Sequence, residues 1–224
     1  MIVHAREPIT LIGGARATPD EVRRLTALAP HVVAADGGAD AALAQGLTPQ
    51  AVIGDFDSLS TDARARLPHD TLYHIPEQDS TDFDKCLRNI NAPLILGAGF
   101  SGARPDHQLA GLNTLVRHPS RRCLLLGGGH LVFLCPPSLR LELPPGMDLS
   151  LFPMGAVEGV SDGLRWPIGG INFAPDGRVG TSNLTEGPVD LSVTAPKMLV
   201  ILPDTGLREV ARALLSAPAG WEKC

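Results

Sequence analysis

Residues 51–58 read Ala-Val-Ile-Gly-Asp-Phe-Asp-Ser, a short apolar run that ends in two aspartates. The apolar part, residues 51–53, has the length and composition of a buried β-strand. The same arrangement occurs upstream, where apolar residues 32–35 precede Asp36, and downstream, where residues 72–75 precede a polar stretch. An apolar strand that ends in polar residues is therefore the repeating unit of the N-terminal half.

Helical segments alternate with these strands. Helix starts are predicted at Thr18 and Thr81, because each threonine has the position and the neighbours of an N-cap. A further helix is expected over residues 107–117, with Leu109 facing inward. Alternation of strands and helices is typical of a parallel sheet, so we expect an α/β domain with a mostly parallel sheet over residues 1–130. Apolar residues recur at helical spacing after the second start, at Phe83, Cys86, Leu87 and Ile90.

The pattern changes after residue 130. Short strand-like runs follow one another, with glycine and proline between them. Residues 139–143 read Leu-Arg-Leu-Glu-Leu, and this period of two is typical of a half-buried strand. Residues 131–224 are therefore predicted to form a smaller, mostly β domain.

The composition is that of a globular protein, with 44% hydrophobic and 19% charged residues. The formal net charge is -5 and no basic run is present, so we expect no nucleic-acid partner. No apolar run approaches the roughly 20 residues that a membrane span needs, and the first residues do not resemble a signal peptide. Four cysteines without a CxxC spacing favour a reducing compartment, and the expected location is the cytoplasm.

Polar clusters follow four of the predicted strands. In an open parallel sheet the loops after the strands share one edge, where ligands bind. Asp55 and Asp57 stand two residues apart, so both side chains point the same way on an extended segment. Such a pair suits a hard cation such as Mg²⁺. An Asp-rich turn with Ser58 capping the next helix explains this motif equally well, but Asp36 and Asp82 at the same edge favour the metal.

Asp82 and Lys85 are spaced at i and i+3 on a predicted helix. Lys85 lies one turn into that helix, where its ammonium group could reach a phosphate. The alternative is a surface ion pair worth roughly 0.2–0.5 kcal/mol, a common use of this spacing. Taken alone, the pair favours the surface interpretation.

Residues 97–102 read Gly-Ala-Gly-Phe-Ser-Gly and match GxGxxG. The acidic residue that a dinucleotide site has about 20 residues later is absent, and so is the GK[ST] sequence of a Walker A loop. We interpret the segment as a glycine loop whose N–H groups approach phosphate, with Arg104 as a charged partner. Asp106 is also a candidate helix N-cap, and His107 a candidate structural histidine.

Trp166, Ser182 and Asn183 are the candidate ligand-binding residues of the second domain. Trp166 offers a flat apolar face to a ring, and the two polar side chains offer hydrogen bonds to a heteroaromatic edge. A core tryptophan and a polar β-turn are the simpler alternative.

Four segments of the first domain resemble, in this order, the motifs of the thiamine pyrophosphokinase (thiamine diphosphokinase) family. They are Asp36-Gly37-Gly38-Ala39-Asp40, Gly54-Asp55-Phe56-Asp57-Ser58, residues 78–87 (Gln-Asp-Ser-Thr-Asp-Phe-Asp-Lys-Cys-Leu) and residues 102–107 (Gly-Ala-Arg-Pro-Asp-His). Residues 163–167 and 182–183 also look like this family. Residues 101–104 depart from it, since they read Ser-Gly-Ala-Arg where a Gly-Gly-Arg run is more usual.

The resemblance implies an enzyme that uses ATP and Mg²⁺ to transfer pyrophosphate to the hydroxyl group of thiamine, giving thiamine diphosphate and AMP. It implies a C-terminal β-sandwich-like domain that binds thiamine. It also implies a homodimer with the active site near the subunit interface.

The resemblance further assigns roles to individual residues. Magnesium would be held by Asp55, Asp57 and Asp82, with Asp36 close by. Phosphate transfer would involve these three ligands together with Lys85, Arg104 and Asp106, and either Asp55 or Asp82 would accept the hydroxyl proton. ATP would contact Asp36, Ser80, Thr81, Gly102, Arg104 and His107. Thiamine would contact Gln78, Ser182, Asn183 and Trp166, the last from its own or the partner subunit.

Two other functions stay open on the residues alone. A metal-dependent phosphohydrolase or nucleotidyltransferase could use the same acidic edge. A non-catalytic protein that binds thiamine or a nucleotide could carry the same motifs. Binding of NADP at the glycine loop is a more distant third.

Overall fold

The computed structural model describes residues 1–102, 104–218 and 220–222. Within it the chain divides into two compact units. The N-terminal unit consists of Met1–Thr114 and Leu125–Gly128, and the C-terminal unit of Leu115–Leu124 and Gly129–Cys224. Strand β8 (Cys123–Gly127) contributes residues to both units.

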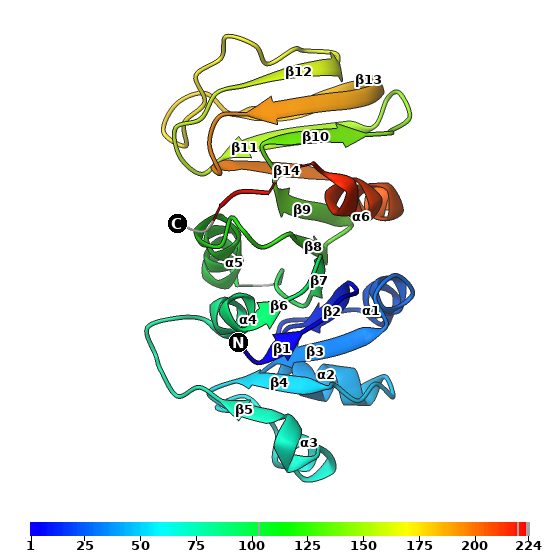
Figure 1. Ribbon diagram of the computed structural model, residues 1–224, viewed down its shortest axis with the longest axis vertical. Coiled ribbons are helices and arrows are strands. Elements are labelled where there is room, and N and C mark those ends of the chain that lie inside the picture. The colour runs from blue at the N-terminus through cyan, green and yellow to red at the C-terminus, as the bar shows by residue number, and fades with distance from the viewer. Residues whose placement is uncertain (103, 219, 223–224) are drawn as a thin grey trace. The chain divides into compact units, whose positions relative to one another are not determined.

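Five parallel strands form the sheet of the N-terminal unit. Their order is β7–β2–β3–β4–β5, and all four pairings are parallel (Figure 1). These strands are β2 (Ile9–Ile12), β3 (His31–Ala35), β4 (Ala51–Gly54), β5 (Leu72–His74) and β7 (Ile95–Ala98). Strands β2, β4 and β7 are buried along their whole length, as expected for strands covered on both faces. Two short strands that the sequence did not predict, β1 (Val3–His4) and β6 (Ile90–Asn91), pair in parallel as a separate sheet.

Both predicted helix starts in this unit are confirmed. Thr18 and Glu21 form a capping box: the Thr18 hydroxyl accepts from the Glu21 N–H at 3.2 Å, and the Glu21 carboxylate accepts from the Thr18 N–H at 2.8 Å. The Thr81 hydroxyl accepts from the Asp84 N–H at 3.2 Å. The helices are α1 (Pro19–Thr26), α2 (Gly38–Ala44), α3 (Thr61–Arg66), α4 (Asp82–Asn89) and α5 (Pro105–Arg117), with a 3-10 turn, η1, at His69–Thr71. The predicted apolar face of α4 is buried.

Ser58 does not cap the next helix. The hydroxyl of Ser60 accepts from the Ala63 N–H at 3.0 Å and is the N-cap of α3. Ser58 is engaged elsewhere, because its N–H donates to Asp36 at 3.1 Å and its hydroxyl donates to Asp57 at 2.8 Å. The alternative in which residues 55–58 are only a turn that leads into a helix is therefore wrong in this detail.

Helix α5 also differs from its prediction. It begins at Pro105, so Asp106 lies inside the first turn and is not the N-cap. Leu109 is 62% exposed and does not face inward, because burial along this helix begins only at Gly111. The first turn of α5 therefore lies in solvent within the described part of the chain.

The C-terminal unit is built from antiparallel strands and one helix. The strand order is β10–β13–β11–β14–β9, and β12 pairs with β13. The elements are β9 (His130–Leu134), β10 (Ser138–Leu141), β11 (Asp148–Pro153), β12 (Gly159–Leu164), β13 (Gly180–Val193), β14 (Met198–Pro203), the 3-10 turn η2 (Asp204–Gly206) and α6 (Leu207–Ser216). Strand β13 is the centre of this unit, since it pairs with three others.

The alternation predicted for residues 139–143 is confirmed, with its three leucines buried and its two charged residues exposed. The long strand β13 was only half predicted. Residues 180–183 form its first part rather than an isolated polar turn, and β12 was missed because its sequence, Gly-Val-Ser-Asp-Gly-Leu, is too polar to read as a strand. Among the described residues, no helix combines the length and the apolar character needed to cross a membrane.

Gly38 is the point of closest approach between α2 and β2, and it supplies a test of the fold. A Cβ atom at Gly38 would lie 2.1 Å from the carbonyl oxygen of Ile12. Gly38→Ala should push the helix away from the sheet and lower the free energy of unfolding by about 3 kcal/mol. Gly46→Ala, at the other end of the same helix, is the matched control: its φ is +74° but no atom lies within 4 Å, so it should cost only about 1 kcal/mol. Urea denaturation measures both, and equal losses would contradict the close packing.

Candidate functional site

The carboxyl ends of β3, β4 and β5 bring the predicted acidic residues together. Asp36 follows β3, Asp55 follows β4 and Asp82 opens the helix that comes after β5. The ends of β3 and β4 lie close together, because a Cβ atom on Gly54 would lie 2.7 Å from the Cβ atom of Asp36. Asp36 and Phe56 both have left-handed backbone conformations, with φ of 43° and 64°. Such strained residues cluster at functional sites, where the surrounding structure holds them.

Asp36, Asp55 and Asp57 form a group that could hold a metal ion. One carboxylate oxygen from each lies within 4.8 Å of the other two. Asp36 is only 2% exposed. Its Oδ2 atom accepts from the Ser58 N–H, whereas its Oδ1 atom is buried without a hydrogen-bond partner among the described residues. A buried carboxylate oxygen without a partner is costly unless a cation or a donor meets it, so the donor set fits a hard divalent ion.

Lys85 lies beside this group and is only 1% exposed. Its ammonium group donates to Asp55 Oδ2 at 2.9 Å and to Asp82 Oδ1 at 3.0 Å. Gln78 donates to the same oxygen of Asp55 at 3.1 Å. The interpretation of Asp82 and Lys85 as a surface ion pair is therefore wrong, because packing against β4 buries the lysine.

Burial and these ion pairs shift the pKa values of the site in different directions. Burial raises the pKa of Asp36 to about 6, although the Ser58 N–H opposes the shift. Burial also raises the pKa of Asp82, against the hydrogen bond from Lys85. Burial alone would raise the pKa of Asp55, but the bonds from Lys85 and Gln78 outweigh it and the pKa is lowered. The two carboxylates hold the pKa of Lys85 above its usual value despite its burial.

The grouping of the aspartates differs from the one expected by resemblance. Asp55 and Asp57 lie in the candidate metal group as expected, but the third member is Asp36. Asp82 lies beside this group, and its Oδ1 atom bonds the Lys85 ammonium group, as Asp55 Oδ2 also does. The position of Asp36 at the end of a predicted strand was the signal that pointed to it.

A cleft of about 690 Å³ opens beside this acidic group in the N-terminal unit. That volume suits a nucleotide-sized ligand. All six residues expected to contact ATP line it, and they are Asp36, Ser80, Thr81, Gly102, Arg104 and His107. The lining also includes residues that the sequence reasoning missed, among them Arg16, Asp40, Ser58, Ser60 and Phe100. Arg16 lies in the loop that follows β2. The search for polar residues after predicted strands, which found the other loops, would therefore have found Arg16 as well.

The glycine loop forms one wall of the cleft. Gly99 has a φ of +81°, and a Cβ atom there would lie 2.5 Å from the carbonyl oxygen of Gly13. The Ala15 N–H donates to Gly99 O at 3.0 Å, which ties this loop to the one after β2. Arg104 and Asp106 form an exposed ion pair at 2.6 Å, so the guanidinium group is oriented before any ligand binds.

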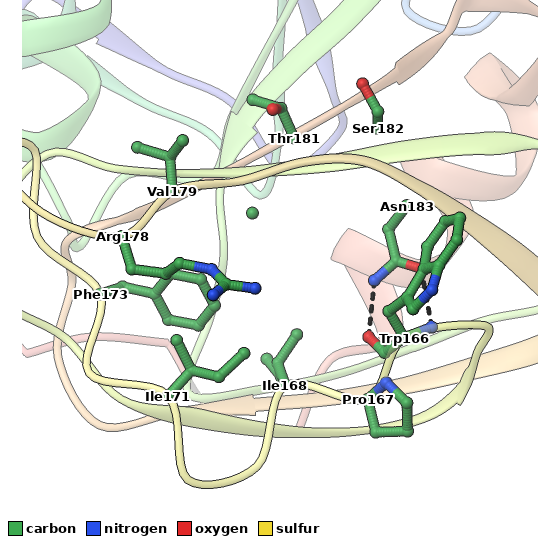
Figure 2. A pocket seen from close by; sticks show the side chains of 11 residues that line it. Trp166, Pro167, Ile168, Ile171, Phe173, Arg178, Val179, Thr181, Ser182 and Asn183 are labelled. Atoms are coloured by element: carbon green, nitrogen blue, oxygen red, sulfur yellow. Dashed lines mark hydrogen bonds between the residues drawn. The ribbon is translucent and has the colours of Figure 1, made fainter.

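A second cavity, of about 540 Å³, lies within the C-terminal unit. Figure 2 shows Trp166 and Arg178 on opposite sides of it, with Ile168 and Ile171 between them. Trp166 is 55% exposed, so the alternative of a core tryptophan is wrong. Its ring is available to a planar ligand on the cavity side.

Asn183 fixes the position of Trp166. Its Oδ1 atom accepts from the Trp166 N–H at 3.2 Å, and its Nδ2 atom donates to the Trp166 carbonyl at 2.7 Å (Figure 2). Both polar ends of this 6% exposed side chain are therefore used within the protein. Ser182 has a φ of 62° and its N–H donates to Ser150 Oγ at 2.9 Å. Asn183 thus positions the cavity wall, while Ser182 lines the cavity directly.

The buried charge of Asp36 gives a prediction for the metal-free protein. Its pKa rises from 3.8 to about 6 on folding, so between these values the folded chain holds a proton that the unfolded chain does not. The contribution of Asp36 to the free energy of unfolding should therefore rise as the pH falls from about 6 to about 4. Asp36→Asn should therefore stabilise the protein by on the order of 2–3 kcal/mol above pH 6, and the advantage should vanish near pH 4.

Urea denaturation in EDTA at several pH values measures this difference. Asp40→Asn is the control, because Asp40 lies in the same cleft but is partly exposed and bonded to Ser60. An Asp36→Asn variant that is less stable than wild type at pH 8 would contradict the assignment of an uncompensated buried charge.

Comparison with known proteins finds one recurring similarity. Residues 22–125 match the family model described as thiamin pyrophosphokinase, catalytic domain. Thiamine pyrophosphokinases 1 and 2 of Arabidopsis thaliana are 30% and 31% identical to the chain over 157 residues. This stretch is 62% of the chain, and it spans 59% of the length of these curated relatives.

Solved structures share the fold. Thiamin pyrophosphokinase from Geobacillus thermodenitrificans superimposes with a TM-score of 0.74 at 21% identity, covering 88% of this chain and 97% of that one. The Bacillus subtilis thiamine pyrophosphokinase gives 0.73 at 20% identity, covering 88% and 99%. The family match, the curated relatives and the fold agree, and each of them is a similarity of this chain to thiamine pyrophosphokinases.

Proposed function

We propose that this protein is a thiamine pyrophosphokinase, which transfers the pyrophosphoryl group of ATP to the hydroxyl of thiamine and releases AMP. The observation that carries the proposal is the Asp36–Asp55–Asp57 group beside a nucleotide-sized cleft. The curated relatives that match residues of this chain are named thiamine pyrophosphokinases. Because the match spans 59% of their length, the activity of the whole protein is inferred here from the site.

Mg²⁺ is the proposed cofactor, with Asp36, Asp55 and Asp57 as its protein ligands. Magnesium prefers oxygen ligands and usually takes one or two carboxylates together with waters and phosphate oxygens. The unpartnered Oδ1 atom of Asp36 is the feature that favours this assignment. When bound there, Mg²⁺ would neutralise charge on the transferred phosphates.

The residues of the cleft would hold ATP and orient it. The Thr81 hydroxyl and the N–H groups of Ser80 and the glycine loop would supply donors to phosphate oxygens, while the Ser80 hydroxyl donates to Glu77. Arg104 supplies a guanidinium fork, which Asp106 already orients. In-line attack by the thiamine hydroxyl on the β-phosphorus then depends mostly on positioning and on charge stabilisation.

Asp82 is the better candidate for the group that accepts the hydroxyl proton. It lines the cleft, whereas Asp55 does not. Only its Oδ1 atom is used by Lys85. Both oxygens of Asp55, in contrast, accept hydrogen bonds from Asp57, Gln78 or Lys85. Gln78 donates to Asp55 through Nε2 and would also contact thiamine, as the resemblance implies.

Thiamine would bind at the cavity of the C-terminal unit, which we take to be the β-sandwich-like part of the fold. Trp166 would stack on a ring of thiamine and Ser182 would offer a hydrogen bond. Residues 1–130 would thus bind ATP and Mg²⁺, and residues 131–224 would bind thiamine. A cytoplasmic homodimer is the proposed assembly.

Product analysis tests the function. Purified protein is incubated with ATP, Mg²⁺ and thiamine, and nucleotides and thiamine esters are separated. The proposal expects AMP and thiamine diphosphate in equal amounts. ADP or free phosphate without thiamine ester would instead indicate a phosphohydrolase, release of pyrophosphate a nucleotidyltransferase, and ligand binding without turnover a binding protein.

The role of Trp166 gives a kinetic prediction. Because its ring is more than half exposed, Trp166→Ala should leave stability almost unchanged. Loss of stacking should raise the KM for thiamine by about tenfold and leave the KM for ATP unchanged. Val160→Ala, which also removes an exposed apolar side chain from the same unit, should change neither constant. An unchanged KM for thiamine in Trp166→Ala would remove the tryptophan from the site.

A further inference from the structure

We propose that Arg88 is a positioning residue for the nucleotide: its guanidinium group fastens the loop of residues 76–80 to helix α4, and the fastened loop holds Ser80 and Thr81 at the wall of the cleft. This inference rests on the proposed function, because it takes ATP to be the ligand of the cleft. Arg88 does not itself line the cleft, so its effect on a nucleotide would pass through the loop.

The loop of residues 76–80 joins β5 to α4, and its shape depends on side chains. The Ile75 N–H donates to Gly54 O at 2.7 Å just before the loop. The Lys85 N–H donates to Thr81 O at 2.9 Å just after it. Among the described residues, no backbone–backbone hydrogen bond joins residues 76–80 to another segment. A segment of this kind opens at a low cost in free energy unless side chains hold it.

Arg88 attaches this loop to the helix. Its Nη2 atom donates to Ser80 Oγ at 3.1 Å and forms an ion pair with Glu77. Ser80 Oγ in turn donates to Glu77 Oε1 at 2.5 Å, so the three side chains form a closed ring of polar contacts. The hydrogen bond from Ser80, and then the one from Arg88, lowers the pKa of Glu77, which keeps its carboxyl group ionised at neutral pH. We call Glu77, Ser80 and Arg88 the loop clamp.

The other edge of the Arg88 guanidinium group is fixed to the helix. Its Nε atom forms an ion pair with Asp84 Oδ2 at 3.0 Å, one turn earlier in α4. Asp84 is only 1% exposed, so this anchor belongs to the packed part of the unit and not to the loop. A planar guanidinium group can engage both sets of partners at once, because its donors point along two different edges.

The loop carries residues that the proposed function uses. Ser80 and Thr81 line the cleft in which ATP would bind. The Ser80 hydroxyl is engaged in the clamp, which leaves the Ser80 N–H for a phosphate oxygen. Gln78 lies between the two clamp residues of the loop and donates to Asp55 at 3.1 Å. Without the clamp, ATP would have to order this loop as it binds, and affinity would be lost.

Nucleotide affinity tests the proposal without any measurement of turnover. Isothermal titration calorimetry measures the Kd for α,β-methylene-ATP with Mg²⁺, in the absence of thiamine. Glu77→Ala removes the carboxylate of the loop and leaves the ion pair between Arg88 and Asp84 intact. It should raise this Kd by about tenfold, because the loop is then ordered only on binding. Glu77 and Arg88 are each more than a third exposed, so the Tm should stay within about 3 °C of wild type.

Two further variants separate a clamp from independent contacts. Arg88→Ala opens the same loop, so the double variant Glu77→Ala/Arg88→Ala should lose no more affinity than Arg88→Ala alone. Arg66→Ala is the matched control: it removes an exposed ion pair with Asp62 in the same unit, and Arg66 does not line the cleft. Its Kd for the nucleotide should equal that of wild type.

Two other readouts distinguish positioning from a general loss of stability. Amide hydrogen exchange in the free Glu77→Ala protein should become faster over residues 77–81 and stay unchanged in β2. In turnover, the KM for ATP should rise by about tenfold while kcat changes by less than about twofold, because bound ATP orders the loop.

An unchanged Kd in folded Glu77→Ala would overturn the proposal, and so would a double variant whose loss is the product of the two single losses. The fate of the proposed function is decided separately. Weaker nucleotide binding by the clamp variants of a protein that forms no thiamine diphosphate would refute the kinase activity and leave the clamp standing. Formation of thiamine diphosphate with an unchanged KM for ATP in Glu77→Ala would do the reverse. A wild type that does not bind the nucleotide would overturn both.

Discussion

Parallel pairing of β3 with β4 and of β4 with β5 is the constraint from which the site follows. It places three strand ends at one edge, and each end is followed by an acidic residue. Gly54 allows the ends of β3 and β4 to approach each other closely, because any larger residue there would collide with Asp36. The concentration of negative charge is thus a result of sheet topology. The carboxylates at this edge repel one another, and the other features of the site determine how far their charge is compensated.

The carboxylates differ in how their negative charge is compensated. Lys85 is built into the protein and compensates Asp55 and Asp82 permanently. Asp36 has no such partner for its Oδ1 atom, and its pKa is raised to about 6 by burial. A fold that keeps an uncompensated carboxylate at neutral pH carries a cost in stability, which a bound cation would remove. The left-handed backbone at Asp36 adds to that cost and is consistent with a position kept for binding.

Local signals in the sequence were sufficient for much of the N-terminal fold. The capping box at Thr18 and the apolar face of α4 depend on residues a few positions apart, and both were predicted correctly. Lys85 was misjudged because its burial depends on β4, thirty residues away in the chain. Asp36 and Asp82 could be placed at one edge from the strand pattern, but their separate partners needed side-chain geometry. Asn183 shows the same limit, since its bonds to Trp166 join segments that are distant in sequence.

Anomalous diffraction from crystals soaked in Mn²⁺ would test the site most directly. The account predicts a peak in contact with carboxylate oxygens of Asp36, Asp55 and Asp57, with Lys85 still bonded to Asp82. A peak held by Asp82, with Lys85 displaced and the Oδ1 atom of Asp36 still without a partner, would contradict it. That result would return the metal to the Asp55–Asp57–Asp82 set that the resemblance implies.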